Sequence, residues 1–132
     1  MRAARGTRRS KYGAIRTTVD GITFDSKREA QRYRELKLLE KAGEIWDLEL
    51  QPEFPLYVPS TSGSLTRAAR AAARGGLIKV GVYRGDFKYH DHSSDGSTHV
   101  WIVEDVKGFR TPLYRWKRKH VMAQYGIEIR EV

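Results

Sequence analysis

Residues 86–107 read DFKYHDHSSDGSTHVWIVEDVK and predict a hairpin of two β-strands. The Asp95-Gly96 pair is a strong signal for a two-residue turn, because such turns require positive φ angles that Asp and Gly tolerate. Aromatic and β-branched residues lie on both sides of this pair, so strands are expected over Leu77–Tyr89 and His99–Lys107. The turn also predicts which side chains meet across the two strands.

The hairpin is expected to bring three charged side chains together. Asp86 precedes Asp95 by as many residues as Asp105 follows Gly96, so the two aspartates face each other. Facing residues on antiparallel strands have Cβ atoms ~4.5–5.5 Å apart. Lys107 shares a face with Asp105, because side chains two apart on a strand point the same way. A bulge in the connection would change this register.

Two carboxylates this close repel each other, and a divalent cation between them removes the conflict. Ligand sets made only of oxygen favour Mg²⁺ or Mn²⁺ over zinc. Such a metal polarises a phosphoryl oxygen and lowers the pKa of a bound water, and Lys107 can orient that water or neutralise developing charge. The alternative is a surface cluster that only solvates the sheet. Asp105 follows the apolar residues 100–103, however, and a buried carboxylate needs partners.

The residues before this hairpin predict a shorter hairpin and a helix. Residues 17–24 contain an Asp-Gly turn between β-formers. Ser26 and Glu29 form a capping box that opens a helix over about Lys27–Ala42, and Gly43 is a suitable stop. The side chains expected to face inward are Ala30, Tyr33, Leu36 and Leu39. Residues 45–58 contain β-like stretches that are broken at Gln51-Pro52.

The residues after the hairpin predict a second helix and a last strand. Thr111-Pro112 gives an N-cap followed by proline at the first helical position, the helix runs to about Gln124, and Gly126 ends it. Residues 127–132 alternate between apolar and charged side chains and indicate a strand. Helix, strands, helix and strand in this order predict an α/β fold, a mixed sheet with flanking helices.

Length and composition limit the class of protein. A chain of 132 residues suits one compact domain, expected over residues 17–132. Met1–Arg16 reads as a flexible basic arm, and Ser60–Gly76 as a mobile loop rich in Arg and Ala. The absence of cysteine excludes disulfides, thiolate metal sites and a cysteine nucleophile. No apolar run is long enough for a membrane span, and no apolar segment follows the basic N-terminus as a secretory signal requires.

The net charge of +9 predicts a polyanionic partner, with nucleic acid ahead of a membrane surface. The charge is segregated, because no acid lies between Glu53 and Asp86 or between Asp105 and Glu128. The alternative is that these cations only solvate the surface. The side chains expected to contact DNA phosphates are Arg8, Arg9, Lys11, Arg67, Arg70, Arg110, Arg115, Lys117, Arg118 and Lys119.

Asp86 followed by Asp105-Val106-Lys107 on the next strand resembles the signature of the PD-(D/E)XK nuclease superfamily. The resemblance implies a restriction-endonuclease-like core with the element order αβββαβ. Many members carry a catalytic glutamate on the first helix, and Glu29 stands in that place. The resemblance therefore implies that Glu29, Asp86 and Asp105 hold the metal and that Lys107 positions the nucleophile. Glu29 also has the simpler reading of a helix cap.

A small phage-encoded branch of this superfamily is more similar still. The similar stretches are FDSKREAQRYRELKLLEKAGEI, LELQPEF, GDF, VEDVKG and YGIEIREV, which span most of the chain from Phe24 onward. The format resembles archaeal-type Holliday junction resolvases. The resemblance implies a Mg²⁺-dependent homodimer that cuts four-way DNA junctions symmetrically in the cytoplasm of an infected host cell, without a membrane or a small-molecule cofactor. A nicking or end-processing nuclease and a non-catalytic basic nucleic-acid-binding protein stay open as alternatives.

A few polar residues near these motifs have two readings. Glu104 is expected to point to the sheet face opposite Asp105 and is not counted as a ligand. The resemblance makes Gln51 a candidate near the site, and a turn-capping amide is the alternative. The histidines His90, His92 and His99 suggest a metal pair, but an exposed polar turn is the preferred interpretation.

Overall fold

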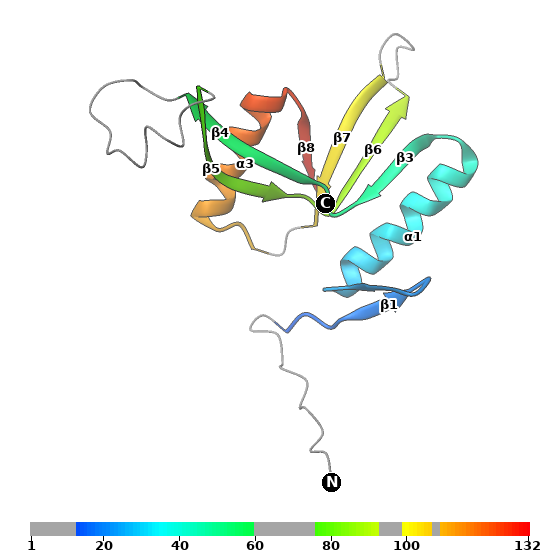
Figure 1. Cartoon of the computed structure of the whole chain (residues 1–132). Helices are drawn as coiled ribbons and strands as arrows, with labels where there is room; N and C mark the ends of the chain where they lie inside the picture. Colours follow the sequence, from blue (N-terminus) through cyan, green and yellow to red (C-terminus); the bar gives the residue numbers. More distant parts are fainter. Residues whose placement is uncertain (1–12, 60–75, 93–98, 107–108) are drawn as a thin grey trace. The chain divides into compact units, whose positions relative to one another are not determined.

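The computed structural model describes residues 13–59, 76–92, 99–106 and 109–132 (Figure 1). These residues divide into two compact units, the first ending at Gly43 and the second beginning at Glu44. The residues are those of an α/β protein with a mixed sheet and two helices. This coarse fold agrees with the prediction from the sequence.

The first unit contains the predicted short hairpin. Strands β1 (Thr17–Val19) and β2 (Ile22–Phe24) pair antiparallel. Asp20 and Gly21 between them have φ angles of 52° and 76°. Positive φ at both central residues is the requirement of the tight turn that the Asp-Gly pair predicts. The prediction is therefore confirmed down to the turn geometry.

Helix α1 (Lys27–Ala42) has the predicted ends. The backbone N–H of Glu29 donates to Ser26 Oγ over 3.1 Å, and Gly43 stops the helix with a φ of 78°. The inward residues Ala30, Tyr33 and Leu36 are buried as expected. Leu39 was expected beside them and is 37% exposed, so that prediction is wrong. Each step of three residues falls about 60° short of a full helical turn, and three steps carry Leu39 to the side opposite Ala30.

The second unit is built on a sheet with the strand order β3-β6-β7-β8. Its strands are β3 (Ile45–Leu50), β6 (Phe87–His92), β7 (His99–Asp105) and β8 (Glu128–Glu131). The first three strands pair antiparallel, and β8 runs parallel to β7. The chain crosses from β7 to β8 through helix α3 (Pro112–Tyr125), which confirms the predicted mixed sheet (Figure 1).

Helix α3 has the capping signals that the sequence predicts. Thr111 is the N-cap, and its side chain accepts the backbone N–H of Tyr114 over 3.1 Å. Proline occupies the first turn, and Gly126 ends the helix with a φ of 63°. These signals are local, which is why the expected and observed ends agree within one residue.

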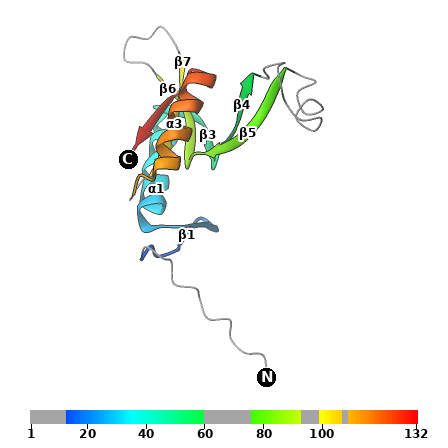
Figure 2. The same ribbon diagram turned by 90° about the vertical axis from the view of Figure 1, so that its left-hand side faces the viewer.

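A two-stranded ribbon projects from the main sheet, as Figure 2 shows. Strands β4 (Glu53–Pro59) and β5 (Leu77–Arg84) form it and pair antiparallel. Side chains from helix α3 satisfy backbone groups of β4. Gln124 Oε1 accepts the Tyr57 N–H, and His120 Nε2 donates to the Tyr57 carbonyl, each over 2.9 Å. The core that joins ribbon, helix and sheet consists of Leu56, Tyr83, Val103, Tyr114, Val121 and Ile129.

The ribbon overturns one prediction. A single strand was expected over Leu77–Tyr89, but it breaks at Gly85-Asp86, and its two halves belong to different sheets. Gly85 N–H donates to the Pro52 carbonyl over 3.0 Å, and Gln51 N–H donates to the Asp86 carbonyl over 2.9 Å. The chain therefore leaves the main sheet at Gln51-Pro52 and returns at Gly85-Asp86, through two adjoining bends.

Some predicted segments lie outside the described residues. They are residues 1–12 of the basic arm, residues 60–75 of the Arg/Ala-rich loop, the Asp95-Gly96 turn and Lys107. In the part of the chain that the structure describes, no helix is long and apolar enough to cross a membrane.

Candidate functional site

Two of the three acidic residues of the predicted site, Asp86 and Asp105, lie at one end of the β6–β7 pair. The register runs from His92 opposite His99 to Phe87 opposite Glu104. This is the register that the Asp95-Gly96 turn predicts, and it is confirmed without reference to the turn itself. Asp86 directly precedes β6, and Asp105 is the last residue of β7.

Each aspartate is held by a hydrogen bond to its surroundings. Asp86 Oδ2 accepts the backbone N–H of Val106 over 2.6 Å, which ties its carboxylate to the residue after Asp105. The Tyr83 hydroxyl donates to Asp105 Oδ2 over 2.7 Å. Asp105 is 1% exposed, whereas Asp86 is half-buried. A buried carboxylate with such partners is a fixed part of the fold rather than a surface charge.

Both carboxylates act on the same phenol. Burial raises the pKa of the Tyr83 hydroxyl well above its usual value, and the charge and hydrogen bond of Asp105 raise it further. The charge of Asp86 raises the same pKa. The side of the sheet follows from the register, because Phe87 lies opposite Glu104 and the next residues outward, Asp86 and Asp105, are therefore expected on the same face.

The buried tyrosines predict a loss of stability in alkali. Burial, followed by the charge of Asp105 and then that of Glu131, also raises the pKa of Tyr114. Above about pH 10, tyrosines in the unfolded chain release protons that these two retain in the folded protein. The free energy of unfolding is therefore expected to fall as the pH rises above about 10. Urea denaturation between about pH 8 and 11 measures this, since the two groups contribute no slope well below their unfolded pKa.

The matched variant is Tyr83→Phe combined with Tyr114→Phe. It lacks both hydroxyls, so its stability should fall less steeply with pH than that of the wild type. The same alkaline slope in both proteins would contradict the assignment of the loss to these tyrosines.

Glu131 binds two of the cations predicted to contact DNA. It lies beside Asp105 in the β7–β8 register and forms ion pairs with Arg110 and with Arg118, the latter over 3.5 Å. The Tyr114 hydroxyl donates to Glu131 Oε1 over 3.1 Å. The sequence had indicated that no acid balances these arginines, and that expectation is wrong, because the balancing acid comes from the last strand.

The other residues predicted to contact DNA differ in whether they already bind groups of the protein. Lys117 Nζ donates to the Val82 carbonyl over 2.9 Å, so this ammonium group links helix α3 to the ribbon. Arg115 and Lys119 are exposed on helix α3. The remaining predicted contacts lie outside the described residues: Arg8, Arg9, Lys11, Arg67 and Arg70.

Glu29 belongs to the first unit and acts there as part of the helix cap. Its Oε1 accepts the Ser26 hydroxyl over 3.2 Å, and its Oε2 accepts the Asp25 N–H over 3.3 Å. This confirms the capping-box prediction. The ligand role of Glu29 stays a prediction that follows from the resemblance.

The acidic pair fits a hard divalent cation in its chemistry. Asp86 and Asp105 supply carboxylate oxygens, the ligands that Mg²⁺ and Mn²⁺ prefer. Within the described ranges, no three His, Asp or Glu side chains gather in one place as a metal site. Lys107, the predicted partner of the pair, is not among the described residues.

The neighbours of the pair are placed by the same strands. Glu104 is fully buried, and its Oε1 accepts the Tyr89 hydroxyl over 2.5 Å. This places it on the face of Tyr89, opposite Asp105, as expected. Gln51 adjoins the site through its backbone bond to Asp86, has a positive φ of 49° and is exposed.

A family model described as "Protein of unknown function (DUF1064)" matches residues 9–131. The chain belongs to this family. Comparison with curated proteins and with solved structures gives no match. The matched region begins in the basic arm at Arg9 and includes the described residues of both units up to Glu131. Asp86 and Asp105 of this DUF1064 chain therefore both lie within the region that the family model covers.

His90 and His92, two histidines of this DUF1064 chain, pack against tryptophans. The rings of Trp46 and His90 are stacked with their centroids 5.3 Å apart, and the centroid of Trp101 lies 3.3 Å from that of His90. His92 also contacts Trp46, at 4.5 Å. These rings form a row across β3, β6 and β7, and such cross-strand aromatic pairs stabilise sheets.

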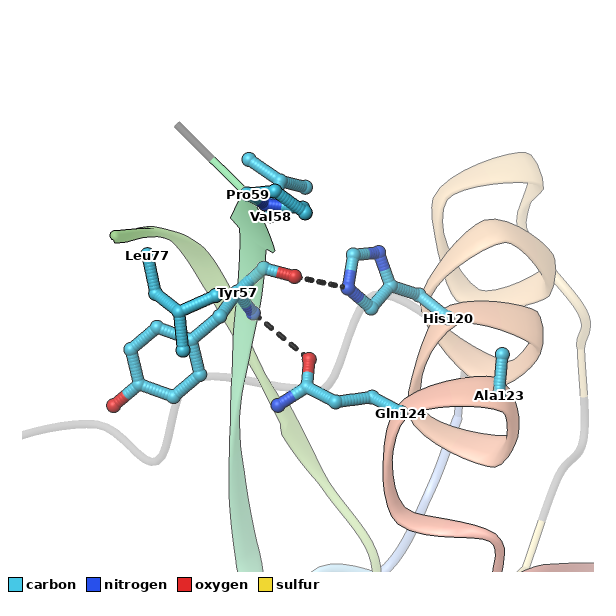
Figure 3. Close-up of a pocket in the computed structure, with 7 residues that line it drawn as sticks. All are labelled: Tyr57, Val58, Pro59, Leu77, His120, Ala123 and Gln124. Carbon is cyan, nitrogen blue, oxygen red and sulfur yellow. Dashed lines mark hydrogen bonds between the residues drawn. The ribbon is translucent and has the colours of Figure 1, made fainter. Parts of the chain in front are cut away.

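A separate cavity of about 480 Å³ lies between the ribbon and helix α3 of the DUF1064 chain (Figure 3). Its lining is Tyr57, Val58, Pro59, Leu77, His120, Ala123 and Gln124. No carboxylate lines it. His120 Nε2 and Gln124 Oε1 bind the Tyr57 backbone, and Gln124 Nε2 donates to the Pro55 carbonyl over 3.1 Å. The sequence offered no signal for this cavity, because it depends on how the ribbon packs on the helix.

Proposed function

We propose that this protein is a metal-dependent endonuclease that cuts branched DNA, with a Holliday junction resolvase as the specific activity. The observation that supports it best is the pair Asp86 and Asp105, two anchored carboxylates at the end of β6–β7 whose strand register sets them opposite each other. Two facing acids destabilise a sheet unless something compensates for their charge. A bound divalent cation would neutralise this repulsion between the two carboxylates.

The element order supports the same proposal. In the two units taken along the chain, α1, β3, β6, β7, α3 and β8 follow the order αβββαβ, with the ribbon β4–β5 inserted after β3. That is the order which the resemblance to PD-(D/E)XK nucleases implies. The proposed fold is therefore a restriction-endonuclease-like core with an additional ribbon.

The proposed roles follow from the donor atoms. Asp86 and Asp105 would hold Mg²⁺, or Mn²⁺, and the resemblance to PD-(D/E)XK nucleases adds Glu29 as a further ligand. Lys107 positions the attacking water. When bound, the metal polarises a phosphoryl oxygen and lowers the pKa of a coordinated water. Tyr83 keeps Asp105 oriented through its hydrogen bond, so this carboxylate is held in one position before substrate arrives.

The proposed assembly is a homodimer. Cutting two strands of a four-way junction symmetrically requires two sites related by a two-fold axis, and a C2 dimer supplies them. The net charge of +9 suits a polyanionic substrate. The exposed cations Arg115 and Lys119 are proposed to contact DNA phosphates, together with the basic residues of the arm and of the 60–76 loop.

The experiment is a cleavage assay with four DNA substrates at one salt concentration: a four-way junction, a flap, a nicked duplex and a linear duplex. We expect Mg²⁺-dependent products from the junction, with product ends mapped to symmetric positions, and none in EDTA. If the linear duplex were cut as fast as the junction, the resolvase activity would be contradicted and the protein would be a general nuclease. Binding with no metal-dependent product from any substrate would favour the non-catalytic basic protein.

A further inference from the structure

The outer face of helix α3 joins exposed cations to an exposed indole. Arg115, Trp116 and Lys119 lie within about 100° of arc around the helix axis, on the side away from the buried Tyr114 and Val121. Trp116 is 47% exposed. In the described ranges, no ion pair engages Arg115 or Lys119, and the helix sequence PLYRWKRKHVMAQY contains no acid.

The indole of Trp116 packs against a neighbouring side chain of the same helix. Its ring lies edge-to-face with the His120 ring, with centroids 5.3 Å apart. His120 is fixed in turn, because its Nε2 donates to the Tyr57 carbonyl of β4 over 2.9 Å (Figure 3). A side chain that is already oriented loses less rotamer freedom when a ligand packs on it.

Few kinds of partner are suited to bind a helix face on which a large exposed aromatic ring lies beside two cations. A second copy meeting this face through a two-fold axis would bring Arg115 and Lys119 near their own counterparts, and those like charges repel. A nucleic acid complements both features, because its phosphates carry negative charge and its bases have flat faces. Bases paired inside a duplex are already stacked, so the indole is useful only to a base that is unpaired or exposed at a break in the stack.

We propose that Trp116 stacks on an unpaired base of a nucleic acid while Arg115 and Lys119 neutralise the adjacent phosphates. This inference deepens the proposed function, since it identifies unpaired nucleotides as the feature of branched DNA that the protein binds. It uses none of the acidic residues, so it can be tested separately from cleavage.

The test measures binding of the full chain to a labelled oligothymidylate and to a linear duplex of equal length, in EDTA. Trp116→Ala is expected to weaken binding of the single strand about ten-fold, the lower part of the range for one stacked base, and to leave duplex binding within about two-fold. The matched control is Trp101→Ala. Trp101 is the other exposed tryptophan of the described residues, at 38%, and lies on β7, so its loss should leave single-strand binding within about two-fold of the wild type.

Tryptophan fluorescence supplies a readout that a purely structural role of Trp116 would not change. Stacking on a base quenches the fluorescence of an indole, so oligothymidylate should lower the tryptophan fluorescence of the wild type. It should not lower that of Trp116→Phe, whose phenyl ring can still stack but which lacks the indole at this position. Arg115→Gln and Lys119→Gln should each lower the salt dependence of binding, by about 0.7 in the slope of log affinity against log salt. Thermal unfolding of each variant confirms that it is folded.

Equal losses on both forms of DNA, an equal loss in Trp101→Ala, or undiminished quenching in Trp116→Phe would each overturn the inference. A change of oligomeric state in Trp116→Ala would assign the face to a second copy and would overturn it too. Absence of cleavage with these binding results intact would remove the proposed nuclease activity and leave the base-stacking site standing.

Discussion

Asp105→Asn is expected to lower Mg²⁺-dependent cleavage of a four-way junction at least about 100-fold while DNA binding persists. Even groups that only orient a metal ligand contribute about 10–100-fold to activity or metal affinity, so loss of a ligand charge should cost more. Asparagine keeps an oxygen that accepts the Tyr83 hydroxyl, so the fold should tolerate the change. Cleavage is measured by gel, and binding by the mobility of the junction in EDTA.

The control for this prediction is Asp91→Asn on strand β6. Asp91 is paired with Arg130 over 3.7 Å and belongs to the sheet face opposite Asp105. Its replacement removes the same charge without touching the proposed site, so cleavage should stay near that of the wild type. Wild-type cleavage by Asp105→Asn, or an equal loss in Asp91→Asn, would contradict the metal-ligand role.

Thermal unfolding provides an independent measurement on the same variant. A ligand that binds only the folded state stabilises it by RT ln(1 + [L]/Kd). Added Mg²⁺ should therefore raise the unfolding temperature of the wild type and have a much smaller effect on Asp105→Asn. Without metal, the variant should be at least as stable as the wild type, since the repulsion between Asp86 and Asp105 is removed.

The features predicted correctly are those with local signals. The turn at Asp20-Gly21, the N-caps Ser26 and Thr111 and the helix stop at Gly43 each depend on the conformation of one or two residues. Such requirements are visible in a single stretch of sequence. The β6–β7 register follows from the Asp95-Gly96 turn in the same way, and this register sets Asp86 opposite Asp105.

The features that were missed depend on contacts between distant segments. Glu131 pairs with Arg110 and Arg118 because β8 returns alongside β7 after a whole helix, and no spacing in the sequence reveals that contact. The break at Gly85 was hidden for a related reason. Residues with high β-propensity lie on both sides of it, and the only local sign is the glycine itself.

Gly85→Ala is expected to lower the free energy of unfolding by about 1–3 kcal/mol, the usual cost of forcing extra volume into a packed core. A Cβ at this position would lie 2.7 Å from Cγ1 of Val103 and 3.5 Å from the Glu104 carbonyl oxygen. The valine is fully buried and cannot move aside freely. Cleavage should fall together with stability, because the bend that would be displaced also positions Asp86.

Gly81→Ala is the matched control in the same segment of chain. A Cβ there would meet only Cε of Lys117 at 3.9 Å, an ordinary contact at the end of a flexible side chain. Its stability should stay within about 0.5 kcal/mol of the wild type, or rise slightly because alanine restricts the unfolded chain. Equal destabilisation by both substitutions would show that general strand propensity, rather than the contact with Val103, requires glycine at Gly85.

A size change on the other side of the contact identifies the cause directly. Val103→Ala alone should destabilise the protein, because it leaves space in the core. Combined with Gly85→Ala, it removes the Cγ1 atom that the new methyl group would meet, so the double variant should lose less stability than the sum of the two single losses. Partial recovery of cleavage in the double variant would connect the packing of this bend to the position of Asp86. Strictly additive losses would instead separate the bend from its contact with β7.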